Sequence, residues 1–333
     1  MNRSVTLKDL AKKINTSVTT ISKALSNHPD ISEQRKKQIL KLAEEMNYVP
    51  NVMASNLRNQ KTKFVGLIVA DNSNPYFARM IKGVEERLTT EGYHTLIFNT
   101  NEEPKKEIDL IMELRSLHVA GVILTPAAGN KESSALLKKF GIPFVLANRY
   151  LDKNTDNYVI ADSEKASYLA IDYLTKYGYE KIFLLNFMDG VSTAVDRRLG
   201  FERALSDKGI IPEPDWVIHG CANQTDGYNA MNRLLDKYKL PFSVLCFNDY
   251  IAVGAIKALH EREISMPNEV ALMGMDDIEL LSYMRPGLST VNMPKVELGR
   301  KSADMLLDII KGNEPINGRQ IVLQPSLVIR ETA

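Results

Sequence analysis

This chain lacks the long apolar runs and the cysteine pattern that mark membrane proteins and secreted proteins. No stretch approaches the roughly 20 uninterrupted apolar residues that a membrane helix needs. Lysines and an aspartate interrupt the first 13 residues, where a secretion signal has its apolar core. The two cysteines, Cys221 and Cys246, cannot form a disulfide framework. We therefore expect a cytoplasmic protein whose thiols are reduced.

The sequence also lacks the motifs of common catalytic and metal sites. It contains no G-x-S-x-G elbow, Walker A loop, H-E-x-x-H or C-x-x-C. Its five histidines are scattered without the spacing of metal ligands. A segment that begins at Asp152 starts like a calcium loop, but Asn157 replaces the turn glycine and Ser163 replaces the bidentate glutamate. We expect no catalysis, no metal and no cofactor.

What is present is the composition of a folded protein with two unlike parts. Hydrophobic residues make up 44% and charged residues 25% of the 333 positions. At about 150 residues per domain, this length predicts roughly two domains. The net charge of +1 conceals an asymmetry, because residues 1–63 carry 12 Lys and Arg against 5 Asp and Glu, while the other 270 carry 30 against 36. A basic head on an acidic body predicts an anionic partner for the head alone.

The pattern of residues 1–50 predicts three short helices. Thr6 opens the first with a capping box. Asn15 can end it in a tight turn, because asparagine tolerates the left-handed backbone. Ser17 can then cap a second helix only two residues later, and a third follows Ser32. Two short helices joined by so tight a turn predict a helix-turn-helix.

The second helix has one apolar face and one polar face. At about 100° per residue, Thr19, Ser22 and Lys23 share the polar face, with Val18 at its edge. Lysine can donate to guanine, hydroxyls can bond bases or phosphates, and valine can pack on a thymine methyl. The alternative is a merely solvated surface, which would suit an isolated helix better. The caps, the tight turn and the positive charge of this segment favour a DNA-reading face.

Residues 51–63 form either a plain linker or a segment that becomes helical on binding. Pro50 and Asn51 are typical of a helix start, but only about seven residues follow before Arg58, and so short a helix is marginal in water. Leu57 has no evident core to join. It could act as a wedge between base steps in a minor groove.

From residue 64 onward, strand-like apolar runs alternate with amphipathic helices. Continuous apolar strands separated by helices are typical of parallel sheets covered on both faces. The number and length of the runs favour an α/β body of two doubly wound lobes over one sheet, and such folds bind ligands outside the carboxyl ends of their strands. The expected strands are 64–70, 94–99, 119–124, 143–147, 181–187, 243–248 and 270–275, and the expected helices lie near 76–91, 104–117, 131–140, 163–177, 195–208, 224–238 and 249–262.

Polar and aromatic residues follow several of these strands. Such a mixture suits a polyol, because amides and charged groups can bond neighbouring hydroxyls while a ring packs on the apolar face. Asn and Asp after strands also commonly cap the next helix, so capping is an equal alternative for Asn248, Asp249 and Asp277. Tyr76 and Phe77 could equally pack at a helix start. The candidates are Asp71–Phe77, Asn148, Arg149, Asp162, Asp189–Thr193, Arg197, Asn248, Asp249, Asp276 and Asp277.

Two stretches, VTLKDLAKKINTSVTTISKAL and NYVPNVMASNLRNQKTKFVGLI, resemble the DNA-binding headpiece and hinge of the lactose-repressor (LacI) family of bacterial transcription regulators. By this resemblance Val18, Thr19 and Lys23 match base-reading positions. Leu57 matches the leucine that paired hinge helices insert at the centre of a palindromic operator. Asn15 stands where the family more often has glycine, although asparagine can still make the turn. The DNA-contacting residues implied are Thr6, Ser17, Val18, Thr19, Ser22, Lys23, Asn51, Ser55 and Leu57.

The body resembles the same family and, through it, the periplasmic sugar-binding proteins. Arg197 matches the first arginine of the family's R-x-x-G-F motif, and Asp276 matches the first aspartate of its G-x-D-D turn; both contact the effector in the family. Many relatives place an effector-stacking aromatic near Ala222, and its absence here leaves the ligand class open. The effector-binding residues implied are Asn74, Tyr76, Phe77, Asn148, Arg149, Arg197, Asn248 and Asp276.

The resemblance covers essentially the whole chain and implies three parts. These are a helix-turn-helix headpiece at 1–50, a hinge helix and linker at 51–63, and an effector-binding and dimerisation domain at 64–333. Within the last, the resemblance implies a first lobe of about 64–162 plus 292–322 and a second lobe of about 163–291 plus 323–333.

The expected function is that of a homodimeric transcription regulator, most simply a repressor, that binds a pseudo-palindromic operator under the control of a small carbohydrate effector. One alternative is a regulator that needs a co-repressor, either a purine or a phosphorylated partner protein. Another is a solute-binding protein of a transport system, which the basic head and the lack of a secretion signal disfavour. The final residues, SLVIRETA, carry no leucine heptad, which favours a dimer over a tetramer.

Overall fold

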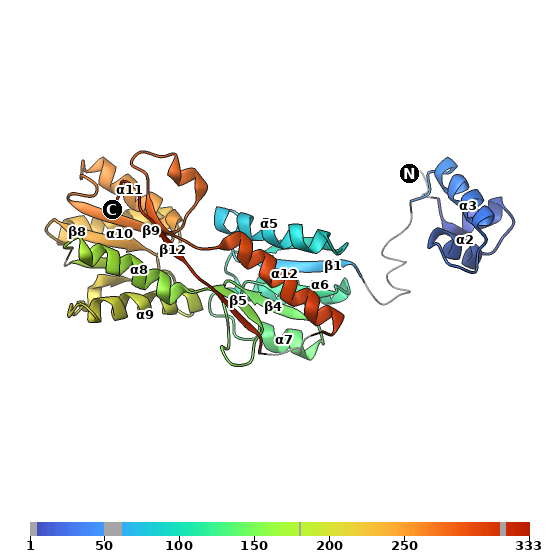
Figure 1. Ribbon diagram of the computed structural model, residues 1–333, viewed down its shortest axis with the longest axis horizontal. Helices are drawn as coiled ribbons and strands as arrows, with labels where there is room; N and C mark the ends of the chain where they lie inside the picture. Colours follow the sequence, from blue (N-terminus) through green and yellow to red (C-terminus); the bar gives the residue numbers. More distant parts are fainter. Residues whose placement is uncertain (1–4, 50–61, 180, 314–317) are drawn as a thin grey trace. The chain divides into compact units, whose positions relative to one another are not determined.

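The chain folds into two units, the head and the body, and the boundary between them in the sequence falls between Thr62 and Lys63 (Figure 1). No helix in the part of the chain that the structure describes is long and apolar enough to cross a membrane. The structure, a computed structural model, describes residues 5–49, 62–179, 181–313 and 318–333.

The head is a three-helix unit, and its predicted helix-turn-helix is confirmed. Thr6 caps the first helix in the expected capping box, and Asn15 turns the chain toward the second with a φ of +50°. Leu10, Ile21 and Ile39, one from each helix, are fully buried and form the centre of a small core. The helices are α1 (Leu7–Lys13), α2 (Val18–Leu25) and α3 (Glu33–Glu45).

The body contains two six-stranded sheets with the same strand order, one in each lobe. The first sheet runs β2-β1-β3-β4-β5-β11 and is parallel throughout. This order is typical of a doubly wound fold, in which the chain winds outward in both directions from a switch point between β1 and β3. The strands are β1 (Phe64–Val69), β2 (His94–Asn99), β3 (Gly121–Leu124), β4 (Phe144–Ala147), β5 (Tyr158–Ala161) and β11 (Gln320–Leu323).

The second sheet runs β7-β6-β8-β9-β10-β12 and departs from the prediction at one edge. There β12 lies antiparallel to β10, with Leu327 opposite Val291. The expectation of purely parallel sheets is wrong for this strand, because β12 arrives directly from the first lobe, without the helical crossover that a parallel neighbour needs. The strands are β6 (Ile182–Leu185), β7 (Val217–Ile218), β8 (Phe242–Cys246), β9 (Val270–Asp276), β10 (Ser289–Asn292) and β12 (Ser326–Val328).

Helices flank both sheets, and the chain crosses between the lobes after β5, after β10 and after β11. Figure 1 shows α12, which follows the second crossing, alongside α5 in the first lobe. The helices are α5 (Pro75–Thr89), α6 (Pro104–Ser116), α7 (Ser133–Lys139), α8 (Ser163–Lys176), α9 (Ser192–Ser206), α10 (Gln224–Lys237), α11 (Asp249–Glu261) and α12 (Lys295–Lys311), with the 3₁₀ turns η1 (Pro214–Trp216) and η2 (Glu279–Ser282).

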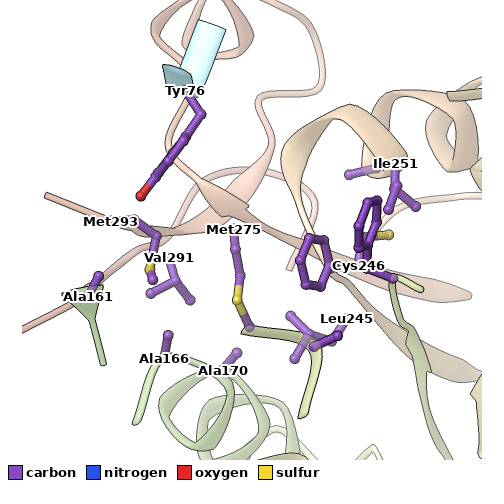
Figure 2. Packing of buried hydrophobic residues seen from close by; sticks show 14 of the residues in the cluster. Tyr76, Ala161, Ala166, Ala170, Leu245, Cys246, Ile251, Met275, Val291 and Met293 are labelled. Carbon is purple, nitrogen blue, oxygen red and sulfur yellow. The ribbon is translucent and has the colours of Figure 1, made fainter. Parts of the chain in front are cut away.

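One buried hydrophobic cluster includes side chains from both sheets. Figure 2 shows Met275 of β9 and Val291 of β10 near Ala166 and Ala170 of α8, whose small side chains let the helix lie close to the strands. Tyr76, at the start of α5 in the first lobe, belongs to the same cluster. Apolar packing therefore extends across the boundary between the lobes, next to the segment that follows β1.

Glycine is required where α5 and α12 cross. A Cβ atom added to Gly83 would lie 2.1 Å from the carbonyl oxygen of Val296, and one added to Gly299 would lie 2.1 Å from the carbonyl oxygen of Met80. Both obstacles are backbone atoms inside helices, so they cannot move aside as a flexible side chain can. The two helices are thus held at backbone contact.

We expect the substitution Gly299→Ala to destabilise the body by about 1–3 kcal/mol or more, because the new methyl group forces α12 away from α5. The measurement is thermal unfolding of the full chain, where the midpoint should fall by at least about 3 °C. Lys301→Ala, at an exposed position of the same helix, should stay within about 0.5 kcal/mol of the unsubstituted chain. Equal stability of the two variants would contradict the close crossing.

Candidate functional site

The polar face of α2 is built as predicted, with Ser17 at its start. The Ser17 hydroxyl oxygen accepts a hydrogen bond from the Thr20 backbone N–H at 3.0 Å, so it serves as the N-cap. Thr19 is exposed, and Ser22 and Lys23 are half-buried on this helix. The hydroxyl of Thr6 is engaged in the capping box of α1. The predicted contacts Asn51, Ser55 and Leu57 lie outside the described residues.

Lys23 has an acidic partner that the sequence pattern does not reveal. Its ammonium nitrogen lies 2.6 Å from a carboxylate oxygen of Asp30, and the two side chains are 41% and 55% exposed. The hydrogen bond from Lys23, together with the charge of nearby His28, holds the pKa of Asp30 below its usual value. The cation predicted to contact guanine is therefore paired within the head.

In the body, one cavity of about 210 Å³ is lined by segments that follow strands of both sheets. In the first lobe these segments follow β1, β2 and β4; in the second lobe they follow β6, β7 and β8 and include the end of β9. This is the place where doubly wound folds bind ligands, because the turns after parallel strands open there. All eight residues predicted to bind the effector line the cavity: Asn74, Tyr76, Phe77, Asn148, Arg149, Arg197, Asn248 and Asp276.

Asparagines with fixed side chains form part of the first-lobe wall. The Asn74 side-chain oxygen accepts the Tyr76 backbone N–H at 2.9 Å, which caps α5. The Tyr76 hydroxyl donates to the side-chain oxygen of Asn148 at 2.8 Å. Asn148 itself has a φ of +69°, which asparagine tolerates better than most residues. Burial raises the pKa of Tyr76, so its hydroxyl keeps its proton and remains a donor.

Arg149 is buried in the same wall and forms a bidentate ion pair with Glu102. Its two terminal nitrogens lie 2.8 and 2.7 Å from the two carboxylate oxygens of Glu102, and one of them also donates to the carbonyl oxygen of Pro126 at 2.7 Å. Glu102 further accepts the Ala128 backbone N–H at 2.9 Å. This bidentate geometry fixes both side chains at the cavity.

Arg197 and Asp276 meet in the second-lobe wall. Both are buried, and a terminal nitrogen of Arg197 lies 4.0 Å from a carboxylate oxygen of Asp276. Arg197 also donates to the carbonyl oxygen of Phe247 and lies 4.0 Å over the centre of that ring. Burial raises the pKa of Asp276 to about 7, although Arg197 and Lys295 act in the opposite direction. The same burial lowers the pKa of Arg197.

Asn248 caps a helix and also lines the cavity, while Asp249, Asp162 and Asp277 lie outside the lining. The Asn248 side-chain oxygen accepts the Ile251 N–H at 2.9 Å and caps α11, and the residue also lines the cavity. Asp249 does not line the cavity; it is fully buried behind it, where burial and the nearby Asp276 raise its pKa to about 8. Asp162 and Asp277 also lie outside the cavity lining. Asp162 caps α8, and a carboxylate oxygen of Asp277 lies 2.7 Å from a terminal nitrogen of Arg330.

Apart from Ala222, five lining residues are not among the candidates predicted from the sequence. They are Asn101, Glu102, Phe187, Met188 and Phe247. Phe187 and Phe247 stack on each other with ring centres 5.0 Å apart and planes 19° from parallel. These two rings supply aromatic surface to the cavity, whereas Ala222, which also lines it, supplies none. Phe247 directly follows β8, and Phe187 follows β6 after one residue, so position near the strand end is the signal that could have identified them.

Hydrogen bonds connect the two lobes beside the cavity. After β4, the Tyr150 backbone N–H donates to the Ser192 hydroxyl oxygen at 3.1 Å, and the Tyr150 hydroxyl donates to Asp196 at 2.8 Å. From α11, the Tyr250 hydroxyl donates to the Ser73 carbonyl oxygen at 2.8 Å. Contacts of this kind break when the lobes separate, so a ligand held by both walls would stabilise the closed arrangement.

Comparison with known families identifies both units. Residues 6–51 match the family described as bacterial regulatory proteins, lacI family. Residues 62–329 match the family described as periplasmic binding proteins and sugar binding domain of LacI family. The HTH-type transcriptional repressor PurR of Haemophilus influenzae strain PittEE is 33% identical over 331 residues, which cover 98% of both chains.

Solved structures agree with these matches. The lac repressor dimer bound to operator and the anti-inducer ONPF shares the fold, with a TM-score of 0.87 at 22% identity over 99% of each chain. A LacI family transcriptional regulator from Enterococcus faecium with bound ribose has a TM-score of 0.71 at 28% identity, over 81% of this chain and 98% of that one. The chain therefore belongs to the LacI family of bacterial regulatory proteins and is a DNA-binding transcriptional regulator.

Proposed function

We propose that this regulator is a dimeric repressor that reads a pseudo-palindromic operator and is controlled by a small carbohydrate in the cavity between its lobes. The observation that carries the proposal is the cavity lining. Polar and aromatic side chains from both lobes line one cavity, so a ligand there contacts both lobes and favours one arrangement of them.

The chemistry of the walls favours a sugar over a purine. Sugar hydroxyls both donate and accept hydrogen bonds, which suits a lining that alternates amides, carboxylates and guanidinium groups. Phe77, Phe187 and Phe247 supply apolar surface for the C–H groups of a sugar ring. At about 210 Å³, the cavity is smaller than the roughly 300–1,000 Å³ of drug-sized sites, so one monosaccharide suits it better than an oligosaccharide.

The head supplies the DNA contacts in this proposal. The α2 helix enters the major groove, where Val18, Thr19 and Lys23 read base edges and Ser17 and Ser22 bond phosphates or bases. Two heads of a dimer read two half-sites, in keeping with the operator-bound lac repressor dimer whose fold this chain shares. Leu57 wedges into the minor groove at the centre of the site. The protein acts on DNA in the cytoplasm and catalyses no reaction.

Effector control is a coupling between the cavity and the heads. A ligand that favours one arrangement of the lobes changes the spacing of the two hinge segments in the dimer, and operator affinity changes with it. A coupling of about 1–3 kcal/mol corresponds to a change in operator affinity of about 5–150-fold.

The test is selection of the full chain against a random double-stranded DNA pool near 150 mM salt, where binding through phosphates alone is weak. A symmetric enriched motif supports a dimeric operator reader. Free sugars and purine bases are then added to the chain bound to that motif. Release by a sugar supports the proposal; a requirement for a purine, or for a phosphorylated protein from cell extract, supports co-repression instead. No motif with or without extract would overturn operator binding.

We expect Asp30→Asn to strengthen DNA binding about two- to fivefold, because Lys23 no longer has to leave an acidic partner in order to contact DNA. The measurement is a binding titration on the selected motif. Glu44→Gln, on α3, removes the same charge from the head without touching the Lys23 pair. If both variants gain affinity equally, net charge alone explains the effect and the ion pair has no role.

A further inference from the structure

We propose that the effector is an uncharged sugar and that its phosphorylated form is rejected, because each arginine of the cavity already has an acidic side chain of the protein beside it. The inference rests on the proposed carbohydrate function and narrows it to one chemical class. It follows from the charges, the amide orientations and the helix ends at the cavity.

The two terminal nitrogens of Arg149 are already used within the protein, and only its Nε lacks a hydrogen-bond partner. Both of its terminal nitrogens are bound to Glu102 in a bidentate pair, at 2.8 and 2.7 Å. One of them also bonds the carbonyl oxygen of Pro126. To bind the terminal nitrogens, a phosphate would have to displace the largely buried Glu102 carboxylate, which is 16% exposed, and this would leave its negative charge without a partner in the same wall.

Arg197 has an acidic neighbour but no hydrogen bond to it, and its Nε has no hydrogen-bond partner. One terminal nitrogen donates to the Phe247 carbonyl, the other lies 4.0 Å from Asp276, and the guanidinium plane is held against the Phe247 ring. The nearby Lys295 is not in the cavity lining and donates to the carbonyl oxygens of Asp276 and Asp277. Among the described residues no lysine lines the cavity, so neither arginine has a neighbouring cation to release it.

The charges of the lining give no net attraction for an anion. Two cations, Arg149 and Arg197, face three carboxyl groups, those of Asp71, Glu102 and Asp276. A phosphate ester carries about −1.5 to −2 charges at pH 7. It would therefore meet a lining with no excess of cations even where Asp276, whose pKa burial raises to about 7, is protonated. In a partly desolvated space, its charge would be repelled strongly by the carboxylates.

The asparagines offer donors suited to neutral acceptors. In Asn74, Asn148 and Asn248 the side-chain oxygen already accepts a hydrogen bond from the protein, at 2.9, 2.8 and 2.9 Å. This fixes each amide so that its NH₂ group remains as the donor. Amide donors and carboxylate acceptors together suit hydroxyl groups, which accept from the first and donate to the second. A fully ionised phosphate can use only the donors.

The helix N-termini near the cavity do not create a net attraction for a phosphate. The N-termini of α5 and α11 are capped by Asn74 and Asn248, each of which accepts one of the free N–H groups that an anion would bind. The start of α9, where Thr193 lines the cavity, has no side-chain cap. The positive partial charge at this helix N-terminus is about half a unit, so it offsets only a fraction of the negative charge of a phosphate dianion.

One consequence concerns the place of this ligand in metabolism. Transfer of the γ-phosphoryl group of a nucleoside triphosphate to a hydroxyl of the free sugar, with release of the nucleoside diphosphate and a proton, would convert the effector into the rejected ester. The regulator would then report the free sugar, and a kinase reaction acting on that sugar would terminate the signal.

The test is calorimetric titration of the full chain with matched pairs of probes: ribose and ribose 5-phosphate, glucose and glucose 6-phosphate, fructose and fructose 6-phosphate, and galactose and galactose 1-phosphate. We expect at least one free sugar to bind and its phosphate ester to bind at least 100-fold more weakly. A phosphate ester that binds as tightly as its parent sugar, or more tightly, overturns the inference but leaves carbohydrate control intact. If no sugar of either kind binds and a purine releases the operator, the proposed carbohydrate function fails and the inference with it.

Two variants connect the rejection to named charges. Asp71→Asn keeps an oxygen for the bonds that Ser73 donates and removes one negative charge from the lining. It should narrow the ratio of affinities for the free and phosphorylated probes at least fivefold. Glu102→Gln, which frees Arg149, should narrow the ratio further. Asp109→Asn, an exposed position on α6 outside the lining, should leave the ratio unchanged; equal effects of D71N and D109N would contradict a local cause.

Discussion

Replacing Arg197 with alanine should abolish the response to effector while leaving operator binding intact. The side chain is buried, holds the Phe247 ring and carbonyl, and lies beside Asp276. Its removal leaves Asp276 buried without its arginine, a change that costs about 3–5 kcal/mol where such a pair is broken. It also deletes the guanidinium surface of the second-lobe wall. We expect at least a 100-fold loss of effector affinity, measured by the concentration that releases the chain from its operator.

The neighbouring arginine provides a matched control. Arg198 lies in the same turn of α9, but its side chain is about 39% exposed and pairs with Glu202 at 2.8 Å. Arg198→Ala should therefore respond to effector normally. Because Arg197→Ala also removes a buried contact, its operator affinity serves as the measure of folding, and Arg197→Lys retains the charge if alanine is too disruptive. A normal effector response in both Arg197 variants would show that the effector binds elsewhere.

The residues of the cavity could be predicted where a general rule of the fold places them. Asn148, Arg149 and Asp276 are polar residues at the ends of apolar strands, and parallel strands bring their carboxyl ends to one edge. Glu102 was missed because its surroundings, NTNEEPKKE, have the composition of an exposed turn and helix start. Its role depends on Arg149, which lies 47 residues away in the chain, and no local pattern encodes that pairing.

The missed aromatic residues illustrate a different limit. Phe187 and Phe247 end runs of apolar residues, and both are almost fully buried, so by hydrophobicity they are typical core residues. What distinguishes them is the packing of one strand end against another. The stack places two rings at the cavity, and their relative position depends on sheet order, which the sequence pattern of either strand alone does not contain.

The fold was predicted in its class but not in every element. Long apolar strands such as β1 and β9 were found, because burial on both faces gives a continuous hydrophobic run. The predicted elements do not include helix α12 or the short strands β5, β7, β10, β11 and β12. β12 has only three residues and lies at a sheet edge, where short length and partial exposure weaken the hydrophobic pattern. α12 follows β10 in the chain but packs on the other lobe.

Lys23→Ala should weaken binding to the selected operator by about 1–3 kcal/mol per head and should relax the base preference at one symmetric pair of positions. Both effects follow if the ammonium group donates to a guanine edge. The measurement is a repeat of the DNA selection with the variant, followed by titrations over a range of salt concentrations. Loss of preference at the same distance from the centre in both half-sites would place Lys23 on a base.

A phosphate contact would give a different result. Affinity would then fall about equally on all sequences, the base preference would persist, and the salt dependence would decrease by about one counterion per head. Lys37→Ala, which removes an equal charge at an exposed position of α3, sets the size of that non-specific effect. Combining Lys23→Ala with Asp30→Asn completes a double-mutant cycle. Since Asp30 acts by pairing Lys23, its substitution should have no further effect once the lysine is gone, and a full gain in affinity in the double variant would show that Asp30 acts on DNA directly.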